Sequence, residues 1–168
     1  MRDSPSLGVL LGAMTYEAAL LCGVAFAAAA VLVLGARWTY PLPPLERHLL
    51  QAWVAGVIGA YLVACWVRQG QTLAQKTWRL RVERDDGRPI GIRTAVLRYL
   101  LAWYLVLPGL ALASLVATGI VSGALVFAAA LLGTCLLARL DREHRLLHDR
   151  LLGTRLVRLP KPARAAAS

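Results

Sequence analysis

Long apolar runs separated by charged segments organise the chain. Residues 8–36 contain one charged side chain, Glu17, and residues 49–67 contain none. A third uncharged run covers residues 99–138, and as one helix it would measure roughly 60 Å, twice the ~30 Å hydrocarbon core of a bilayer. We therefore expect it to fold back at "ATGIVSG", where small and β-branched residues permit a turn. The pattern predicts four membrane spans, at about 8–34, 49–67, 99–117 and 121–138.

A different periodicity marks the segment between the second and third apolar runs. In "WRLRVERDDGRPIG" the apolar residues Trp78, Leu80 and Val82 alternate with charged ones, and Asp86-Gly87 follows. Alternation with period two and a glycine that tolerates positive φ predict a β-hairpin. An isolated hairpin is marginally stable in water, so it needs a partner. The partner predicted here is "TRLVRL" near the end of the chain, which repeats the alternation.

The predicted fold class is therefore an all-α membrane protein, a four-transmembrane-helix bundle with a small cytoplasmic β-hairpin/strand platform. Residues 1–160 form a single membrane domain, and residues 161–168 are expected to be disordered. Next to the second span, "GQTLAQKTW" places an apolar residue, a lysine and a tryptophan in a short segment, a composition typical of the membrane interface.

Composition and charge agree with this interpretation and set its orientation. The chain is 58% hydrophobic with a mean hydropathy of +0.59, whereas soluble domains are roughly 45–50% apolar. Eight Lys or Arg residues lie in residues 68–98 and eight more follow residue 138, but only two lie in residues 37–48. Because cytoplasmic loops carry the excess of basic residues, the loop 68–98, the tail 139–168 and both termini are predicted to be cytoplasmic.

The same features argue against two other interpretations. A cleaved signal peptide is disfavoured because "MRDSP" has no net positive charge and the first apolar run exceeds the usual core of about 7–15 residues. Clustered arginine can indicate nucleic-acid binding. Here the orientation of a membrane protein already explains the clusters, so no nucleic acid is expected. Anionic lipids of the cytoplasmic leaflet are the expected partner of the basic segments.

Candidate chemistry is sparse. His144, His148 and Asp141 could share a helix face, but the neighbouring arginines Arg142, Arg145 and Arg150 oppose a dication, so neither a metal site nor a cofactor is predicted. The sequence contains no phosphate-binding glycine loop, nucleophile elbow or HExxH motif, and we expect no catalytic residue and no enzyme. The three cysteines lie in apolar runs without paired spacing and are interpreted as core residues: Cys22, Cys65 and Cys135.

Two motifs carry a family resemblance. "GQTLAQKTWRLRVERDDGRPIGIRTAVLRYL" in the middle and "LLHDRLLGTRLV" near the end, taken together, resemble the RDD family of small bacterial membrane proteins, from about Leu7 to Val157. The family's first aspartate falls on Glu17 and its second on Asp149, while its arginine position is occupied by Leu10. The other family positions fall on Gly70, Gln71, Thr72, Lys76, Gly87, Pro89, Arg98, His148, Gly153 and Thr154.

The resemblance implies a bacterial inner-membrane protein, and it favours cation/proton exchange or other small-solute transport, in which Glu17 would titrate inside the bundle. The alternative is a non-catalytic scaffold or assembly factor acting through its cytoplasmic platform. An acid within a span needs a partner, and Arg98 at the start of the third span is predicted to pair with Glu17. Asp149 is expected to accept bonds from backbone amides or from a nearby arginine such as Arg79 or Arg81.

Two glycine spacings in the apolar runs suit contact with a protein partner. GxxxG spacings permit close approach of helices and occur at Gly8/Gly12 and Gly119/Gly123. They make a homo-oligomer one possibility, and another membrane protein is the second.

Overall fold

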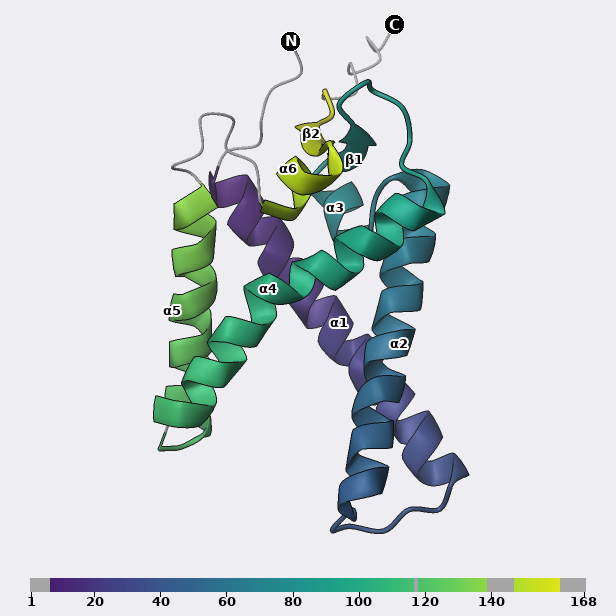
Figure 1. Cartoon of the computed structure of the whole chain (residues 1–168), viewed down its shortest axis with the longest axis vertical. Helices are drawn as coiled ribbons and strands as arrows, with labels where there is room; N and C mark the ends of the chain where they lie inside the picture. The colour runs from purple at the N-terminus through teal and green to yellow at the C-terminus, as the bar shows by residue number, and fades with distance from the viewer. Residues whose placement is uncertain (1–6, 117, 139–146, 161–168) are drawn as a thin grey trace, which may run out of the picture. The chain divides into compact units, whose positions relative to one another are not determined.

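The computed structural model describes residues 7–116, 118–138 and 147–160, and within them the chain is mostly helical (Figure 1). The chain consists of two compact units, one of residues 1–82 with 157–168 and the other of residues 83–156. The first unit contains α1, α2 and α3, and the second contains α4, α5 and α6. In chain order the elements are α1 Leu7–Gly35, α2 Pro44–Gln69, α3 Leu73–Thr77, β1 Leu80–Arg84, α4 Ile92–Val116, α5 Ile120–Ala138, α6 Leu147–Leu152 and β2 Thr154–Arg158.

Three helices are long and apolar enough to cross a membrane: α1, α2 and α4. A shorter apolar segment, Val121–Ala130, lies in α5. The first two predicted spans lie inside α1 and α2. The third lies within α4 except for residue 117, which is outside the described residues. Helix α4 begins before the predicted span, because the arginines of its first turns limit burial in lipid but do not interrupt helical hydrogen bonding.

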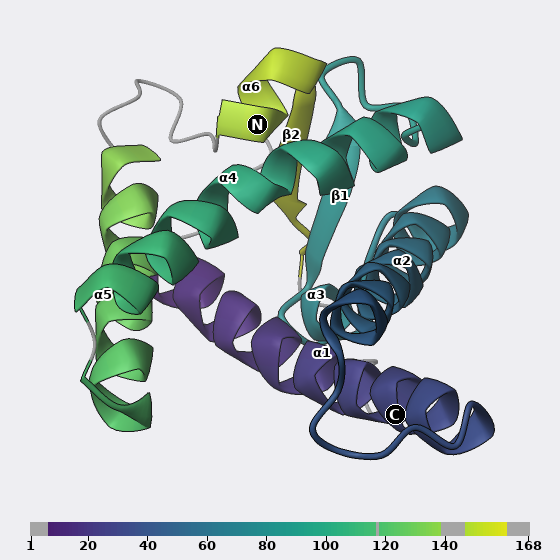
Figure 2. The same cartoon turned by 60° about the horizontal axis from the view of Figure 1, so that its bottom comes forward.

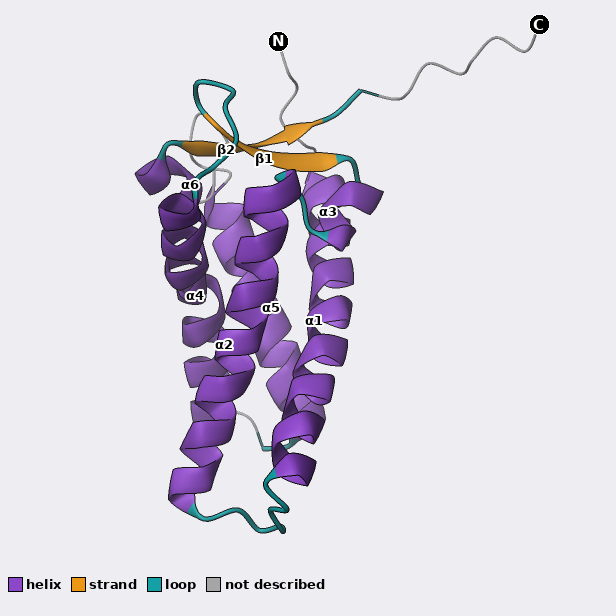
Figure 3. Cartoon of the chain, turned by 90° about the vertical axis from the view of Figure 1, so that its right-hand side faces the viewer, coloured by secondary structure: helices purple, strands orange, loops and turns teal. Residues whose placement is uncertain are grey.

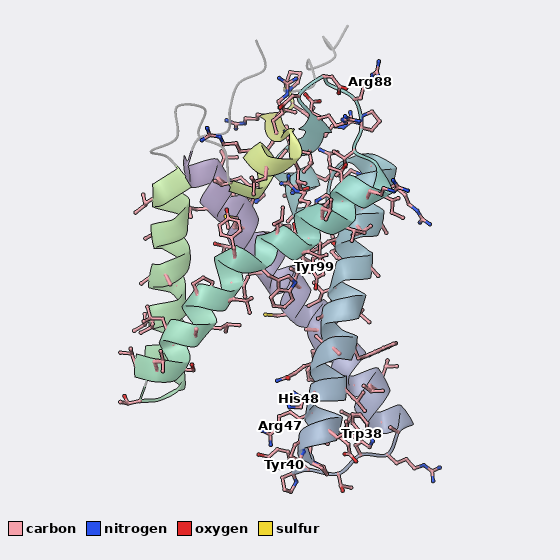
Figure 4. The ribbon with its side chains drawn as sticks, in the orientation of Figure 1. Trp38, Tyr40, Arg47, His48, Arg88 and Tyr99 are labelled. Atoms are coloured by element: carbon pink, nitrogen blue, oxygen red, sulfur yellow. The ribbon has the colours of Figure 1, made fainter. Side chains whose placement is uncertain are left out.

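In the first unit, α1 and α2 run antiparallel (Figure 1), and the short α3 follows α2 (Figure 2). The indole Nε1 of Trp53 donates a hydrogen bond of 3.0 Å to the carbonyl oxygen of Ala28, which ties the two long helices together. Around the connection between them lie Trp38, Tyr40, Arg47 and His48 (Figure 4). Tryptophan and tyrosine gather at the water interfaces of membrane proteins, so this connection marks one end of the helical pair.

At the other end of α2, Gly70 reverses the chain. Its φ of 68° lies in the left-handed region, and its amide donates to the carbonyl oxygen of Trp66 at 2.9 Å. A Cβ at this position would lie 3.1 Å from the carbonyl oxygen of Val82. That carbonyl belongs to the backbone, so a side chain at residue 70 meets a neighbour that cannot simply rotate away.

We expect Gly70→Ala to lower the free energy of unfolding by about 1–2 kcal/mol, the cost of a left-handed conformation for a residue with a Cβ. Thermal unfolding of the purified protein in detergent measures this. Gly56→Ala is the matched control, because Gly56 lies inside α2 with no neighbouring atom within 4 Å of the added Cβ. Equal stability of the two variants would contradict the prediction.

In the second unit, α4 and α5 form an antiparallel hairpin (Figure 1). Gly109 permits their close approach, because a Cβ there would lie 2.9 Å from the ring of Phe127. Helix α6 also contacts α4. Ile90 and Ala95, which are 3% and 0% exposed, are the buried apolar residues around the start of α4.

β1 and β2 form a two-stranded antiparallel sheet (Figure 3). In the first unit the amide of Leu159 donates to the carbonyl oxygen of Arg79 at 2.8 Å, and in the second unit the amide of Asp85 donates to that of Gly153 at 3.0 Å. The predicted pairing of "TRLVRL" with the alternating segment is confirmed. Leu80 and Val82 are fully buried, as period two requires.

The predicted hairpin is wrong in its second arm. The turn forms as expected, with Gly87 at a φ of 81° and its amide donating to the carbonyl oxygen of Arg84 at 2.9 Å. Residues 88–91, however, do not continue as a strand. Pro89 has no amide hydrogen to donate, so it cannot extend a ladder there.

Candidate functional site

Two clusters of polar side chains lie at the ends of the apolar helices, one in each unit. The Glu17 cluster consists of Glu17, Tyr61, Cys65 and Thr72. The Arg98 cluster consists of Arg98, Asp149 and Thr154. Each cluster joins an apolar helix to the short elements that follow the helices in its own unit.

Glu17 lies in α1, about 15 Å along the axis from the first helical residue at 1.5 Å per residue. The hydroxyl of Thr72 donates a hydrogen bond to its Oε2. The other carboxyl oxygen, Oε1, is buried and has no hydrogen-bond partner among the described residues. One oxygen of the carboxyl is thus held in place by Thr72, and the other is buried without a hydrogen bond among the described residues.

Thr72 is prepared for this contact by its place in the backbone. It is the N-cap of α3, where its Oγ1 accepts a hydrogen bond of 3.2 Å from the amide of Gln75, and the Gln75 side chain accepts one of 3.0 Å from the amide of Thr72. This reciprocal capping box fixes the side chain. Because the hydroxyl oxygen accepts from Gln75, its single hydrogen remains to be donated to Glu17.

The loop that carries Thr72 is anchored to β1. The side-chain amide of Gln71 donates to the carbonyl oxygen of Leu80 at 2.7 Å. The amide of Val82 donates to the carbonyl oxygen of Gly70 at 2.8 Å. These three consecutive residues therefore act together. Gly70 reverses the chain, Gln71 binds β1, and Thr72 hydrogen bonds to the carboxyl of Glu17.

Two further polar side chains come from α2. Tyr61 and Cys65 are one turn apart on α2, and both lie close enough to Glu17 to interact with it electrostatically. Tyr61 also lies near Leu73 at the start of α3. The carboxyl of Glu17 therefore lies where α1, α2 and α3 meet, among hydroxyl groups that can donate to or accept from it.

Replacing Thr72 with Val removes the cap and the hydrogen bond to Glu17 while keeping the side-chain shape. We expect a loss of about 1–3 kcal/mol in the free energy of unfolding, from the lost cap and from a carboxyl oxygen left without a donor. Thr72→Ser, which keeps the hydroxyl, should recover most of it. The measurement is thermal unfolding in detergent, and a Ser variant as unstable as the Val variant would show that the hydroxyl is not responsible.

The three residues of the Arg98 cluster are joined by hydrogen bonds. The guanidinium Nη1 of Arg98 donates to Oδ1 of Asp149 and, at 3.0 Å, to the hydroxyl of Thr154, which itself donates to the same Asp149 oxygen at 2.8 Å. The three residues are 4%, 3% and 0% exposed, respectively. Buried charges persist in proteins when they are paired and hydrogen bonded in this way. The network fixes α6 and the first residue of β2 to α4.

A second ion pair lies on the sheet. The Nη2 of Arg155 donates a hydrogen bond of 3.1 Å to the carboxylate of Glu83, and the Glu83 side chain is only 4% exposed. Glu83 interrupts the burial alternation of β1, and this pair explains why a charged residue is buried there.

The candidate residues from the sequence are therefore found in new combinations. Within its own unit, Glu17 accepts from Thr72, and Arg98 pairs with Asp149. Asp149 therefore accepts from a nearby arginine, as expected, and it also accepts from Thr154. The predicted contacts of Glu17 with Arg98 and of Asp149 with Arg79 or Arg81 join residues of different units and stay predictions.

The remaining motif positions are structural or peripheral. Lys76, Gly87 and Pro89 are exposed, and Gly153, with a φ of 58°, occupies the turn between α6 and β2. The side chains of His148 and Cys135, and all of His144 and Asp141, lie outside the described residues. Among the residues that the structure describes, no group of three His, Cys, Asp or Glu side chains is placed to hold a metal ion.

Several contacts were missed from the sequence although signals were present. "TLAQ" at residues 72–75 is a capping-box pattern, and it indicates a helix start with an available hydroxyl. Tyr61 and Cys65 have the i, i+4 spacing of one helix face. Trp78 gave no such signal: its ring lies against Gly12 of α1, so closely that a Cβ there would be 2.4 Å from it.

Three long apolar helices, a shorter apolar one and a small two-stranded sheet define an integral membrane protein with several candidate spans. Comparison with known families makes the class specific. The chain belongs to the RDD family, whose pattern it matches over residues 5–153. That match contains Glu17, Thr72, Arg98 and Asp149 and ends one residue before Thr154. No curated protein and no solved structure matches the chain.

Proposed function

We propose that this chain is a four-span protein of the bacterial cytoplasmic membrane that exchanges protons for a small cation, with Glu17 as the group that carries the proton. The observation that supports this most directly is the state of its carboxyl. One oxygen is fixed by Thr72 and the other is buried without a hydrogen-bond partner among the described residues. An ionisable group inside a span is expensive unless it serves a pathway or a partner.

The chemistry of the surrounding groups fits a proton or an alkali cation. Carboxylate and hydroxyl oxygens are hard ligands, which suit small hard cations better than thiolates or imidazoles do. Glu17, Thr72 and Tyr61 supply such oxygens from three helices of one unit. A cation and a proton would compete for the same carboxyl, and this competition is the minimal requirement for exchange.

The proposed topology has α5 as the fourth span. Its 19 residues correspond to about 28 Å of helix, close to the ~30 Å hydrocarbon core. With four spans, the basic segments after α2 and after α5 both lie on the cytoplasmic side, and so do both termini. The connection containing Trp38 and Tyr40 then lies outside. This orientation puts Glu17 nearer the cytoplasmic face.

A second candidate function is a membrane scaffold, and the Arg98 cluster is the observation that favours it. A buried ion pair that fixes α6 and β2 to α4 gives a rigid platform, which suits docking of another membrane protein or of a second copy of this chain. In this proposal Glu17 is a packing acid held by Thr72.

Reconstitution separates the two functions. The purified full chain is placed in proteoliposomes, and internal pH is followed after imposing gradients of Na⁺, K⁺ or Li⁺. Exchange predicts proton flux that depends on one or more of these cations and exceeds that of protein-free vesicles. Flux equal to that of protein-free vesicles under all three gradients would reject the exchange proposal and leave the scaffold.

A further inference from the structure

The first turns of α4 carry two faces of different character. Arg93, Val96, Leu97 and Leu100 have the i, i+3, i+4, i+7 spacing of one helix face, and all four are exposed, the three apolar ones at 40%, 49% and 56%. We call these four residues the Arg93 stripe. Between them along the chain, Ala95 and Arg98 are buried. Arg98 therefore points inward to Asp149, whereas Arg93 lies on the exposed face beside apolar side chains.

Arg93 has no carboxylate within ion-pair distance among the residues that the structure describes. Its surroundings are apolar: Ile92, Arg93, Val96 and Leu97 line a shallow, open groove. Ile92 is 64% exposed. A guanidinium at the edge of an apolar groove matches an amphiphile that has an anionic head and a hydrocarbon tail.

The length of α4 identifies the kind of amphiphile. Its 25 residues correspond to about 37 Å of helix, which exceeds the ~30 Å hydrocarbon core. The charged residues of α4, Arg93 and Arg98, both lie in its first two turns, so we assign the excess length to this end and place it in the headgroup region, where long basic side chains extend toward phosphate groups. Guanidinium groups also match the geometry of phosphate oxygens better than ammonium groups do.

We propose that the Arg93 stripe binds one anionic phospholipid, with its phosphate at the Arg93 guanidinium and an acyl chain along Val96, Leu97 and Leu100. The site lies entirely in the second unit. It does not depend on proton exchange at Glu17, so failure of either proposal leaves the other standing.

Lipid binding to the purified, delipidated full chain tests this proposal. Phosphatidylglycerol and phosphatidylcholine are titrated in detergent, and the midpoint of thermal unfolding is followed as a function of lipid concentration. Phosphatidylglycerol should stabilise the parent at lower concentration than phosphatidylcholine. Arg93→Gln should weaken apparent phosphatidylglycerol affinity about fivefold or more, the factor that corresponds to about 1 kcal/mol per basic residue at a membrane surface.

Arg88→Gln is the matched control. It removes the same charge in the same unit, from a side chain that is 80% exposed in the turn after β1 (Figure 4), and it should leave the apparent affinity within twofold of the parent, an order-of-magnitude bound for a screened surface charge. Leu97→Ala keeps every charge and should weaken binding by shortening the apolar contact. This variant preserves the test if Arg93→Gln does not fold.

Three results would overturn the proposal. Equal losses for Arg93→Gln and Arg88→Gln would show general charge attraction. Equal protection by sn-glycerol 3-phosphate would show a site for free phosphate that needs no acyl chain. Unchanged binding by Leu97→Ala would show that the apolar part of the stripe takes no part.

Discussion

Arg98→Ala is expected to lower the free energy of unfolding by about 3–5 kcal/mol, because it removes the guanidinium that pairs with the buried carboxylate of Asp149. Asp149 is 3% exposed, so water cannot replace the guanidinium without opening the structure. Asp149→Ala should cost a similar amount by removing the carboxylate that pairs with the buried guanidinium of Arg98. Thermal or chemical unfolding of the purified protein in detergent measures both losses.

The double variant distinguishes a specific pair from two independent defects. If Arg98 and Asp149 interact as the structure shows, the Arg98→Ala/Asp149→Ala protein should be more stable than the sum of the two single losses predicts. Arg88→Ala serves as a control, because Arg88 and Asp86 form an exposed pair at 4.0 Å and such pairs contribute about 0–1 kcal/mol. Strictly additive losses at Arg98 and Asp149 would contradict the buried network.

Glu17→Gln is expected to leave the chain folded and to reduce cation-dependent proton flux to the level of protein-free vesicles. Glutamine keeps the shape of the side chain and an oxygen that can accept from Thr72, but it cannot bind and release a proton in this pH range. Glu46→Gln makes the same chemical change at a half-buried position in the first turn of α2 and should retain the parent's flux. Flux is measured in proteoliposomes containing equal amounts of each protein.

The two proposed functions differ in what this variant shows. Under exchange, the parent has flux, Glu46→Gln has flux and Glu17→Gln has none, while its unfolding midpoint stays close to the parent's. Under scaffolding, none of the three has flux, and Glu17→Gln differs only in stability or in partner binding. A folded Glu17→Gln protein with undiminished flux would reject Glu17 as the proton carrier.

The helices could be predicted because hydropathy is a local property of the sequence. Runs such as residues 49–67 contain no charged residue, and within a bilayer a helix satisfies the hydrogen bonding of their backbone. The partner strand was also predictable, since "TRLVRL" has the same period-two pattern as β1. The second arm of the hairpin was predicted wrongly. The alternation and the Gly87 turn favoured a second strand, but Pro89 has no amide hydrogen, and the ladder ends there.

Pairing of charged residues could not be predicted in the same way. Glu17 and Arg98 have similar depths along their helices, and one-dimensional counting made them a plausible pair. Within each unit, the tertiary structure supplies a donor to the acid: a capped threonine hydroxyl for Glu17 and the Arg98 guanidinium for Asp149. Which donor reaches a buried carboxylate depends on side-chain direction and on the turn at Gly70, and neither is contained in a hydropathy profile.

Proton release on cation addition tests the central claim most directly, because it reports competition at Glu17 without a membrane or a leak. The full chain in lightly buffered detergent is mixed with Na⁺, K⁺ or Li⁺ at constant ionic strength, and a pH indicator records protons released. Exchange predicts release of up to about one proton per chain by the parent and by Glu46→Gln for at least one cation, and none by Glu17→Gln. Equal release by the parent and Glu17→Gln, or no release by the parent with any of the three cations, would contradict the account.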